Sequence, residues 1–155
     1  MTPTRTLGLL AALTVTLALL PACSTSTFVD TDRARHLAAL PYPDDAERAP
    51  DRDILVQRDG GQIRIINRSA QPFDNVQLWV NRQYVAELDR IDIGTDNRVS
   101  LRGLVNRFQE AFPTAGPLTP DRTEPVTSAE LYDPATGQRH RLTVMPEHRE
   151  QLGER

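Results

Sequence analysis

The sequence has no lysine, one cysteine and few aromatic residues, and these shortages narrow the possible functions. One cysteine excludes an intramolecular disulfide and a zinc site built from several thiolates. Serine-nucleophile signatures and glycine-rich phosphate loops that follow a strand are also missing. Arginine at every basic position is typical of GC-rich coding and does not indicate recognition chemistry. The 155 residues carry 18 basic and 21 acidic side chains, and an acidic excess argues against a general nucleic-acid binder. We expect no cofactor and no nucleic-acid partner.

The N-terminus carries an apolar segment that is too short to cross a membrane. Residues 7–20 contain no charge, whereas a spanning helix needs about 20 apolar residues. Arg5 precedes this segment, and small residues follow it, which is typical of a secretory signal. The sequence Leu20-Pro21-Ala22-Cys23 resembles the lipobox of bacterial lipoproteins, which ends in a Leu, two mostly small residues and an invariant Cys. Pro21 departs from the usual small residue.

This resemblance implies a cellular location for the protein. Residues 1–22 would be a signal peptide, and Cys23 would carry diacylglycerol after cleavage. A thioether-linked lipid also removes the free thiol, which would be a liability in an oxidising compartment. The implied location is the bacterial cell envelope, with Ser24 resembling a signal for the periplasmic face of the outer membrane in a Gram-negative cell. The alternative is an ordinary signal peptide with an incidental cysteine.

Residues 23–50 are predicted to form a flexible tether that contributes no residues to the hydrophobic core. A short helix is expected over residues 30–40, with Asp30 or Thr31 as its cap and Leu37 and Leu40 on one side. Prolines end the helix, and the acidic run that follows should stay extended and solvated. The alternative is that part of the segment packs along the domain, with Tyr42 as the contact. Residues 146–155 form a charged tail that should be frayed or a short surface helix.

Residues 51–145 carry strand patterns and are long enough for one small domain. The first hairpin is expected where Asp59-Gly60 separates two apolar runs, because both residues of such a turn take positive φ readily. A two-residue turn at this point sets Val56 opposite Ile63 and Ile54 opposite Ile65. Four β-branched residues then share one face.

The second hairpin joins residues 76–80 to residues 84–88. A three-residue loop at 81–83 pairs Val80 with Tyr84, Leu78 with Ala86 and Val76 with Leu88. This register collects six apolar or aromatic side chains on one face, whereas a two-residue loop would divide them. Burial should select the longer loop, since a slip by one residue moves every side chain to the other face.

A third hairpin is expected between residues 126–132 and 138–144, around a turn with Pro early and Gly late. Residues 98–101 form a further strand, and residues 104–108 form a strand or a helical turn. About seven short strands predict an all-β fold, a small antiparallel β-sandwich. Residues 73–101 are similar to immunoglobulin-like or fibronectin-like sandwiches of bacterial envelope proteins, although the disulfide of true immunoglobulin domains is lacking.

Metal and calcium sites are not expected. His36, His140 and His148 fall in the tether, a strand and the tail, and such scattered positions do not converge on one metal ion. Asp89, Asp92 and Asp96 bracket a turn without the ligand spacing of an EF-hand, so a polar turn is the better interpretation.

Five residues are candidates for contact with a partner. Arg98, Arg102 and Arg107 could line one surface and bind an anionic glycan or phosphate, or they could form a solubilising face paired with nearby acids. Trp79 shares the second face of its hairpin with Val85. That face is either covered by the other sheet or exposed as a contact surface, where aromatic residues are common.

These features together predict a non-catalytic, membrane-anchored envelope lipoprotein. Its β-sandwich would bind another envelope component, either a protein or a glycan, and the lipid on Cys23 would hold it at the membrane. The alternatives are a structural spacer without a specific ligand and, less favoured, a weak enzyme or a glycan-binding accessory domain.

Overall fold

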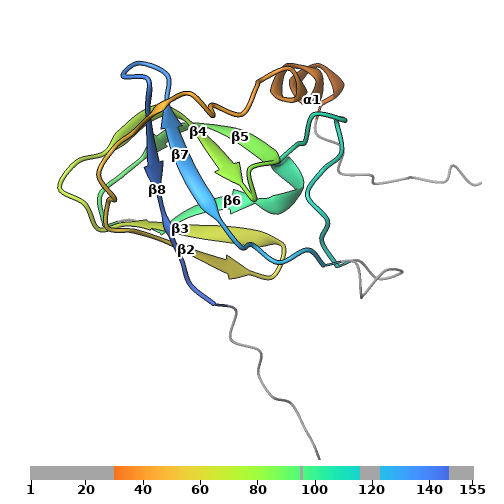
Figure 1. Ribbon diagram of the computed structural model, residues 1–155. Coiled ribbons are helices and arrows are strands. Elements are labelled where there is room, and N and C mark those ends of the chain that lie inside the picture. The colour runs from red at the N-terminus through yellow and green to blue at the C-terminus, as the bar shows by residue number, and fades with distance from the viewer. Residues whose placement is uncertain (1–29, 95, 116–122, 147–155) are drawn as a thin grey trace, which may run out of the picture.

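The computed structural model describes residues 30–94, 96–115 and 123–146 of the chain (Figure 1). Two sheets face each other across one core, which confirms the predicted all-β sandwich. One sheet contains, in order, β1 (Glu47–Arg48), β8 (Gln138–Arg141), β7 (Ala129–Asp133), β4 (Phe73–Val80) and β5 (Tyr84–Ile91). The other contains β6 (Asp96–Ser100), β3 (Gln62–Asn67), β2 (Ile54–Asp59) and β9 (Thr143–Val144).

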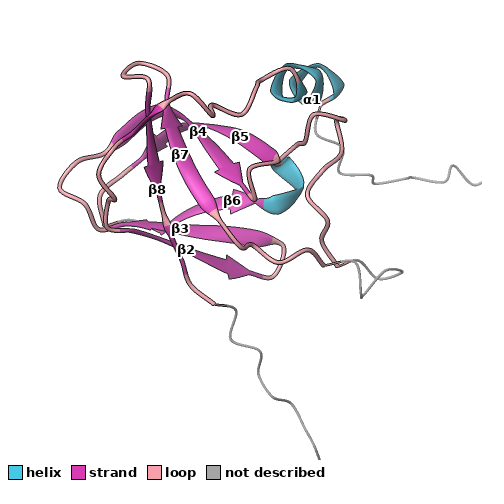
Figure 2. Cartoon of the chain, in the orientation of Figure 1, coloured by secondary structure: helices cyan, strands magenta, loops and turns pink. Residues whose placement is uncertain are grey.

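Helix α1 (Thr31–Ala38) and the short 3-10 helix η1 (Leu101–Gly103) complete the regular structure of these ranges (Figure 2). None of the helices in the described ranges has the length and apolar character needed to cross a membrane. In the part of the chain that the structure describes, helix occurs only in the N-terminal segment and in the connection that follows β6.

β2, β3 and β6 lie in one sheet of the sandwich, and β4, β5, β7 and β8 lie in the other. The described ranges hold nine strands rather than about seven, and the sandwich is not wholly antiparallel. The two additional strands, β1 and β9, are two residues long and pair in parallel with β8 and β2 at the sheet edges.

The core lies between the sheets and follows the period of two that strands impose on their side chains. Ile54 and Val56 on β2 face inward, and the same alternation holds on β3, on β7 and on β4 from Val76 to Val80. The fully buried aliphatic residues of this core include Ile63, Ile65, Val76, Leu78, Val80 and Leu131. Leu101 and Leu104 extend it beyond β6, so the 3-10 helix closes one end of the sandwich.

The turn of the first hairpin lies one residue later than predicted, which shifts the cross-strand pairing by two residues. Val56 pairs with Ile65, and Asp59 pairs with Gln62, so Gly60-Gly61 is the turn instead of Asp59-Gly60. Gly60 has a φ of +58°, a conformation that costs glycine little. The shift is two residues long, which preserves the inward face because strand side chains alternate.

The second hairpin has the predicted register: Val80 pairs with Tyr84, and Leu78 pairs with Ala86. Its loop places the left-handed residues at Asn81 (φ +51°) and Arg82 (φ +57°), not at the third position. Asn81 tolerates this conformation because its side chain is fixed from outside the hairpin. Its Nδ2 donates to the Glu124 carboxylate at 2.9 Å, and its Oδ1 accepts from the Thr127 backbone N–H at 2.9 Å.

The third hairpin is confirmed by the pairing of Leu131 with His140 and of Asp133 with Gln138. The chain leaves the first sheet at Leu142, whose backbone N–H donates to Ala129, and then pairs with β2 of the other sheet. Segment 104–108 is neither of the predicted alternatives, because only Val105 makes strand-like bridges there.

The prediction that the N-terminal segment carries no core is wrong for residues 30–49. Helix α1 begins at the predicted cap, Asp30, and buries Leu37 completely and Ala34 almost completely. The segment also supplies strand β1 and the buried Ala49. The apolar outer face of β4 and β5 provides the reason, since α1 covers it (Figure 1). Positions 23–29 and 147–155 lie outside the described residues, as does the predicted anchor Cys23.

Candidate functional site

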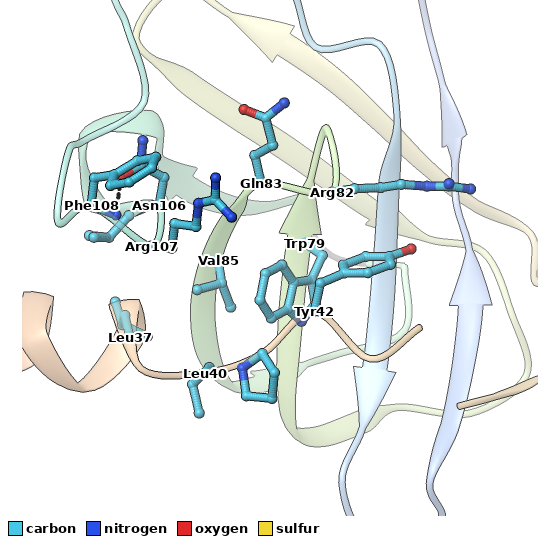
Figure 3. A pocket seen from close by; sticks show the side chains of 12 residues that line it. Leu37, Leu40, Tyr42, Trp79, Arg82, Gln83, Val85, Asn106, Arg107 and Phe108 are labelled. Atoms are coloured by element: carbon cyan, nitrogen blue, oxygen red, sulfur yellow. Dashed lines mark hydrogen bonds between the residues drawn. The ribbon is translucent and has the colours of Figure 1, made fainter. Parts of the chain in front are cut away.

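A pocket of about 540 Å³ lies on the outer face of the first sheet, away from the sandwich core (Figure 3). Three parts of the chain enclose it: the N-terminal strap (residues 31–49), the loop between β4 and β5, and the loop at residues 104–111. The lining residues of these parts and of the sheet include Leu37, Leu40, Tyr42, Trp79, Arg82, Gln83, Val85, Val105, Asn106, Arg107 and Phe108. Its volume is in the range of ordinary ligand sites.

The floor of the pocket is the cross-strand pair Trp79 and Val85. They are 3% and 1% exposed, respectively, and form a second hydrophobic cluster with Leu37 and Val105. The sequence left open whether the other sheet covers this face or solvent reaches it. The structure shows that the strap and Val105 cover it, so Trp79 and Val85 are not an exposed contact patch. The Trp79 Nε1–H donates to Gln77 Oε1 at 3.2 Å, which satisfies the buried indole.

One wall of the pocket is Tyr42, the residue named as the contact in the packed alternative for this segment. Its hydroxyl donates to Glu130, and Arg139 in turn donates to the hydroxyl oxygen. Arg139 also lies 3.7 Å from the Glu130 carboxylate, and both side chains are largely buried. Burial, followed by the Glu130 carboxylate, raises the pKa of Tyr42. The phenol therefore stays protonated and holds the strap against β7 and β8.

The opposite wall is a tight loop that exposes Phe108. Val105 bridges to Ala111 and to Val85, which closes the loop onto the edge of β5. Asn106, only 8% exposed, accepts through Oδ1 from the backbone N–H groups of Phe108 and Glu110, both at 2.9 Å. The Phe108 side chain is nevertheless 66% exposed. The loop is thus internally bonded while its one aromatic ring remains in solvent.

The structure does not bring the three candidate arginines together. Arg107 lines the pocket, and its guanidinium carbon lies 4.7 Å from the centre of the Phe108 ring. Arg98 is on β6 and pairs with Asp59 at 3.3 Å and with Asp96 at 3.4 Å. Arg102 is in η1 and donates to Thr114 Oγ1 at 3.2 Å. Arg98 therefore follows the alternative of a solubilising face paired with acids.

Three further titratable side chains, His36, His140 and Asp96, make contacts away from the pocket lining. His36 Nε2 lies 3.0 Å from Glu87 Oε1 and joins α1 to β5. His140 is buried against Phe73, with ring centres 5.4 Å apart, and burial lowers its pKa. Asp96 accepts from Arg64 at 3.0 Å. Within the described ranges no three His, Cys, Asp or Glu side chains group in a way that would hold a metal ion, and His148 lies outside those ranges.

Sequence reasoning did not identify Phe108, Asn106 or Arg82 as site residues. The available signal was a lone aromatic residue in a polar stretch, Asn106 to Glu110. Nothing in the local pattern connects it to Trp79 or to residues 37–42, because the pocket is assembled from three distant segments.

Comparison of the chain with family models, with curated proteins and with solved structures finds no match. The fold and the pocket define a class of architecture: a small all-β sandwich with a strap-covered pocket on the outer face of one sheet.

Proposed function

We propose that the protein is a non-catalytic, membrane-anchored envelope lipoprotein whose β-sandwich binds another envelope component through the outer pocket. One observation carries this proposal: the exposed Phe108 ring on a loop held by the nearly buried Asn106. A large apolar side chain gains nothing for folding when it stays in solvent. A fixed aromatic ring beside a pocket is typical of a contact surface, because little conformational entropy is lost when it binds.

The anchor is supported by the lipobox-like sequence that ends at Cys23. Seven peptide units separate Cys23 from Asp30, where α1 is capped, and they span at most about 25 Å when fully extended. Because α1 borders the pocket, a lipid on Cys23 would hold the pocket near the membrane surface. The partner is therefore expected among components that approach within this distance of the bilayer.

Contact through the pocket is tested by placing a photo-crosslinking amino acid at position 108 in the full-length protein in living cells. The matched control places it at Ile93, which is also exposed (49%) but does not line the pocket. We expect a discrete adduct from position 108 and none from position 93, since only the first faces the partner. A spacer without a ligand predicts the same diffuse background from both positions, and that result would refute the proposal.

Anchoring is tested with Cys23→Ser and metabolic labelling by an alkyne fatty acid. The native chain should take up the label and fractionate with membranes, whereas the variant should lose both properties. A second Cys23→Ser chain, carrying a conventional cleavable signal, controls for an uncleaved signal peptide. Labelling of the variant, or membrane association of the control chain, would show that Cys23 is not the anchor.

A further inference from the structure

We infer that the pocket takes an acidic peptide segment with an apolar side chain between its carboxylates. This inference rests on the proposed binding function and specifies the chemistry of the partner. It follows from three properties of the lining: unpaired positive charge, an apolar floor, and a separation between the two positive groups.

The first property is the charge of the rim. Arg82 and Arg107 line the pocket, and in the part of the chain that the structure describes neither has an ion-pair partner. Elsewhere on the surface, Arg64 pairs with Asp96 at 3.0 Å and Arg90 pairs with Asp74 at 2.7 Å. The chain as a whole has a formal charge of −3. A rim with two uncompensated guanidinium groups in an acidic protein is complementary to carboxylates.

The nearby acids Glu110 and Glu130 accept hydrogen bonds from side chains other than Arg82 and Arg107. None of the described residues that line the pocket is Asp or Glu. Glu110 accepts from Asn106 Nδ2 at 2.9 Å, and Glu130 accepts from Tyr42 and lies beside Arg139. Arg82 and Arg107 instead lie over the rings of Tyr42 and Phe108, at 5.9 and 4.7 Å from the ring centres. These contacts leave the charge of both guanidinium groups available to an anion.

The second property is the apolar interior between the two arginines. Trp79 and Val85 form the floor, and Leu40 and Phe108 contribute apolar surface at its sides. A volume of about 540 Å³ accommodates apolar side chains of a ligand, which need to leave water to bind. Because Trp79 and Val85 are already buried, the apolar surface open to a ligand is that of Phe108 and, in part, Leu40. A purely polar anion would leave that surface hydrated, so we expect the ligand to carry an apolar group between its charges.

The third property favours a peptide over a single-headed amphiphile. Arg82 and Arg107 come from different loops and lie on either side of Gln83 (Figure 3), which favours a ligand that offers a carboxylate to each of them. The Gln83 side-chain amide has no hydrogen-bond partner among the described residues, and it can donate to and accept from a peptide unit. An extended segment supplies both spaced carboxylates and backbone polar groups, whereas a fatty acid supplies neither beyond its head.

The inference is tested by titrating peptides against the full chain in phosphatidylcholine nanodiscs. Trp79 is the only tryptophan and lies on the pocket floor, so its fluorescence reports occupancy. One pentapeptide pool has Asp or Glu at both ends and apolar residues in the centre. A second pool replaces the acidic ends by Lys or Arg, a third replaces the apolar centre by Gly and Ser, and hexanoate serves as the amphiphile.

We expect the acidic–apolar pool to bind at least about tenfold more tightly than each of the other three probes. The other probes either lose charge-assisted hydrogen bonds to the arginines or leave the apolar part of the pocket unfilled. The double variant Arg82→Gln, Arg107→Gln should lose this preference. Arg98→Gln, which removes a paired arginine distant from the pocket, should keep it. Equal binding of acidic and basic pools, tighter binding of hexanoate, or no response to any probe would overturn the inference. If position 108 still crosslinks to a partner after such a result, the proposed function stands and only the peptide chemistry is wrong.

Discussion

The rings of Tyr42 and Trp79 meet at nearly a right angle, with an interplanar angle of 88° and centroids 5.3 Å apart. This is a favourable edge-to-face geometry for aromatic pairs. Tyr42 belongs to the strap and Trp79 to the centre of the first sheet, so the contact joins the N-terminal segment to the domain. The Tyr42 hydroxyl is held in turn by Glu130 on β7 and Arg139 on β8. The pocket therefore has a wall that is fixed at both its ring and its hydroxyl.

Core packing predicts that Leu78→Ala strongly lowers the stability of the fold. Leu78 is fully buried between the sheets, so truncation should lower the free energy of unfolding by about 2–5 kcal/mol. Gln77→Ala removes the acceptor of the Trp79 indole and should cost only about 1 kcal/mol. Urea denaturation of both variants measures the difference. Equal losses for the two substitutions would contradict the assignment of the core to the Leu78 face.

The packing of the strap on the sheet predicts that Leu37→Ala lowers the stability of the protein and changes the environment of Trp79 at the pocket floor. Leu37 is fully buried against Trp79, and its loss should lower the free energy of unfolding by about 2 kcal/mol and shift Trp79 emission to longer wavelength. Arg35→Ala, on the exposed side of α1, is the control and should change neither quantity appreciably. A chain shortened to begin at residue 50 should likewise melt at a lower temperature. Unchanged melting of that chain would show that the strap contributes no stability.

Because Asn106 holds the loop at residues 104–111, we expect Asn106→Ala to weaken partner binding more than it lowers the stability of the fold. The substitution removes acceptors for two backbone N–H groups, at about 1 kcal/mol each, and frees Phe108 from its fixed position. Crosslinking from position 108 should therefore become diffuse, and amide hydrogens at 108 and 110 should exchange faster. Phe108→Ala should abolish partner binding with little change in unfolding, because its ring is exposed. Slow exchange at both amides in the Asn106→Ala chain would show that other contacts hold the loop.

The pH dependence is predicted from Tyr84. Burial and the neighbouring Glu124 carboxylate raise the pKa of Tyr84 to about 12 in the folded chain, above about 10 in the unfolded chain. The folded state thus retains a proton that the unfolded state loses, so stability is full below pH 10 and falls as the pH rises toward 12. The slope should be about 1.4 kcal/mol per pH unit.

Tyr84→Phe is the control for this pH effect, since it removes the titrating hydroxyl but keeps the ring against Phe112. The quantity to measure is the difference in unfolding free energy between the native chain and Tyr84→Phe from pH 9 to 11.5. This difference isolates Tyr84, because the pKa of Tyr42 is raised in both proteins. A difference that is constant over this range would mean that the hydroxyl does not titrate with a raised pKa.

Much of the first sheet was predictable because its signals are local. The second hairpin has three loop residues and six apolar positions within a short stretch, and only one register buries them all. The helix cap at Asp30 was predictable for the same reason, because its side chain accepts a hydrogen bond from the backbone N–H two residues later. The first hairpin shows the limit of such patterns. Alternation sets which face is buried, but a shift by two residues keeps that face and moves the turn.

The sequence by itself determined the longer strands, the buried faces of the hairpins and the short helix, since each depends on neighbours within a few residues. Only the tertiary structure decided that the strap covers Trp79, that β1 joins β8 across some 90 residues, and that the Phe108 loop closes the pocket. These contacts depend on which apolar surface remains after the two sheets have packed. A segment with one buried leucine and one tyrosine has no periodicity that reveals its partner, because that partner is a surface that exists only in the folded chain.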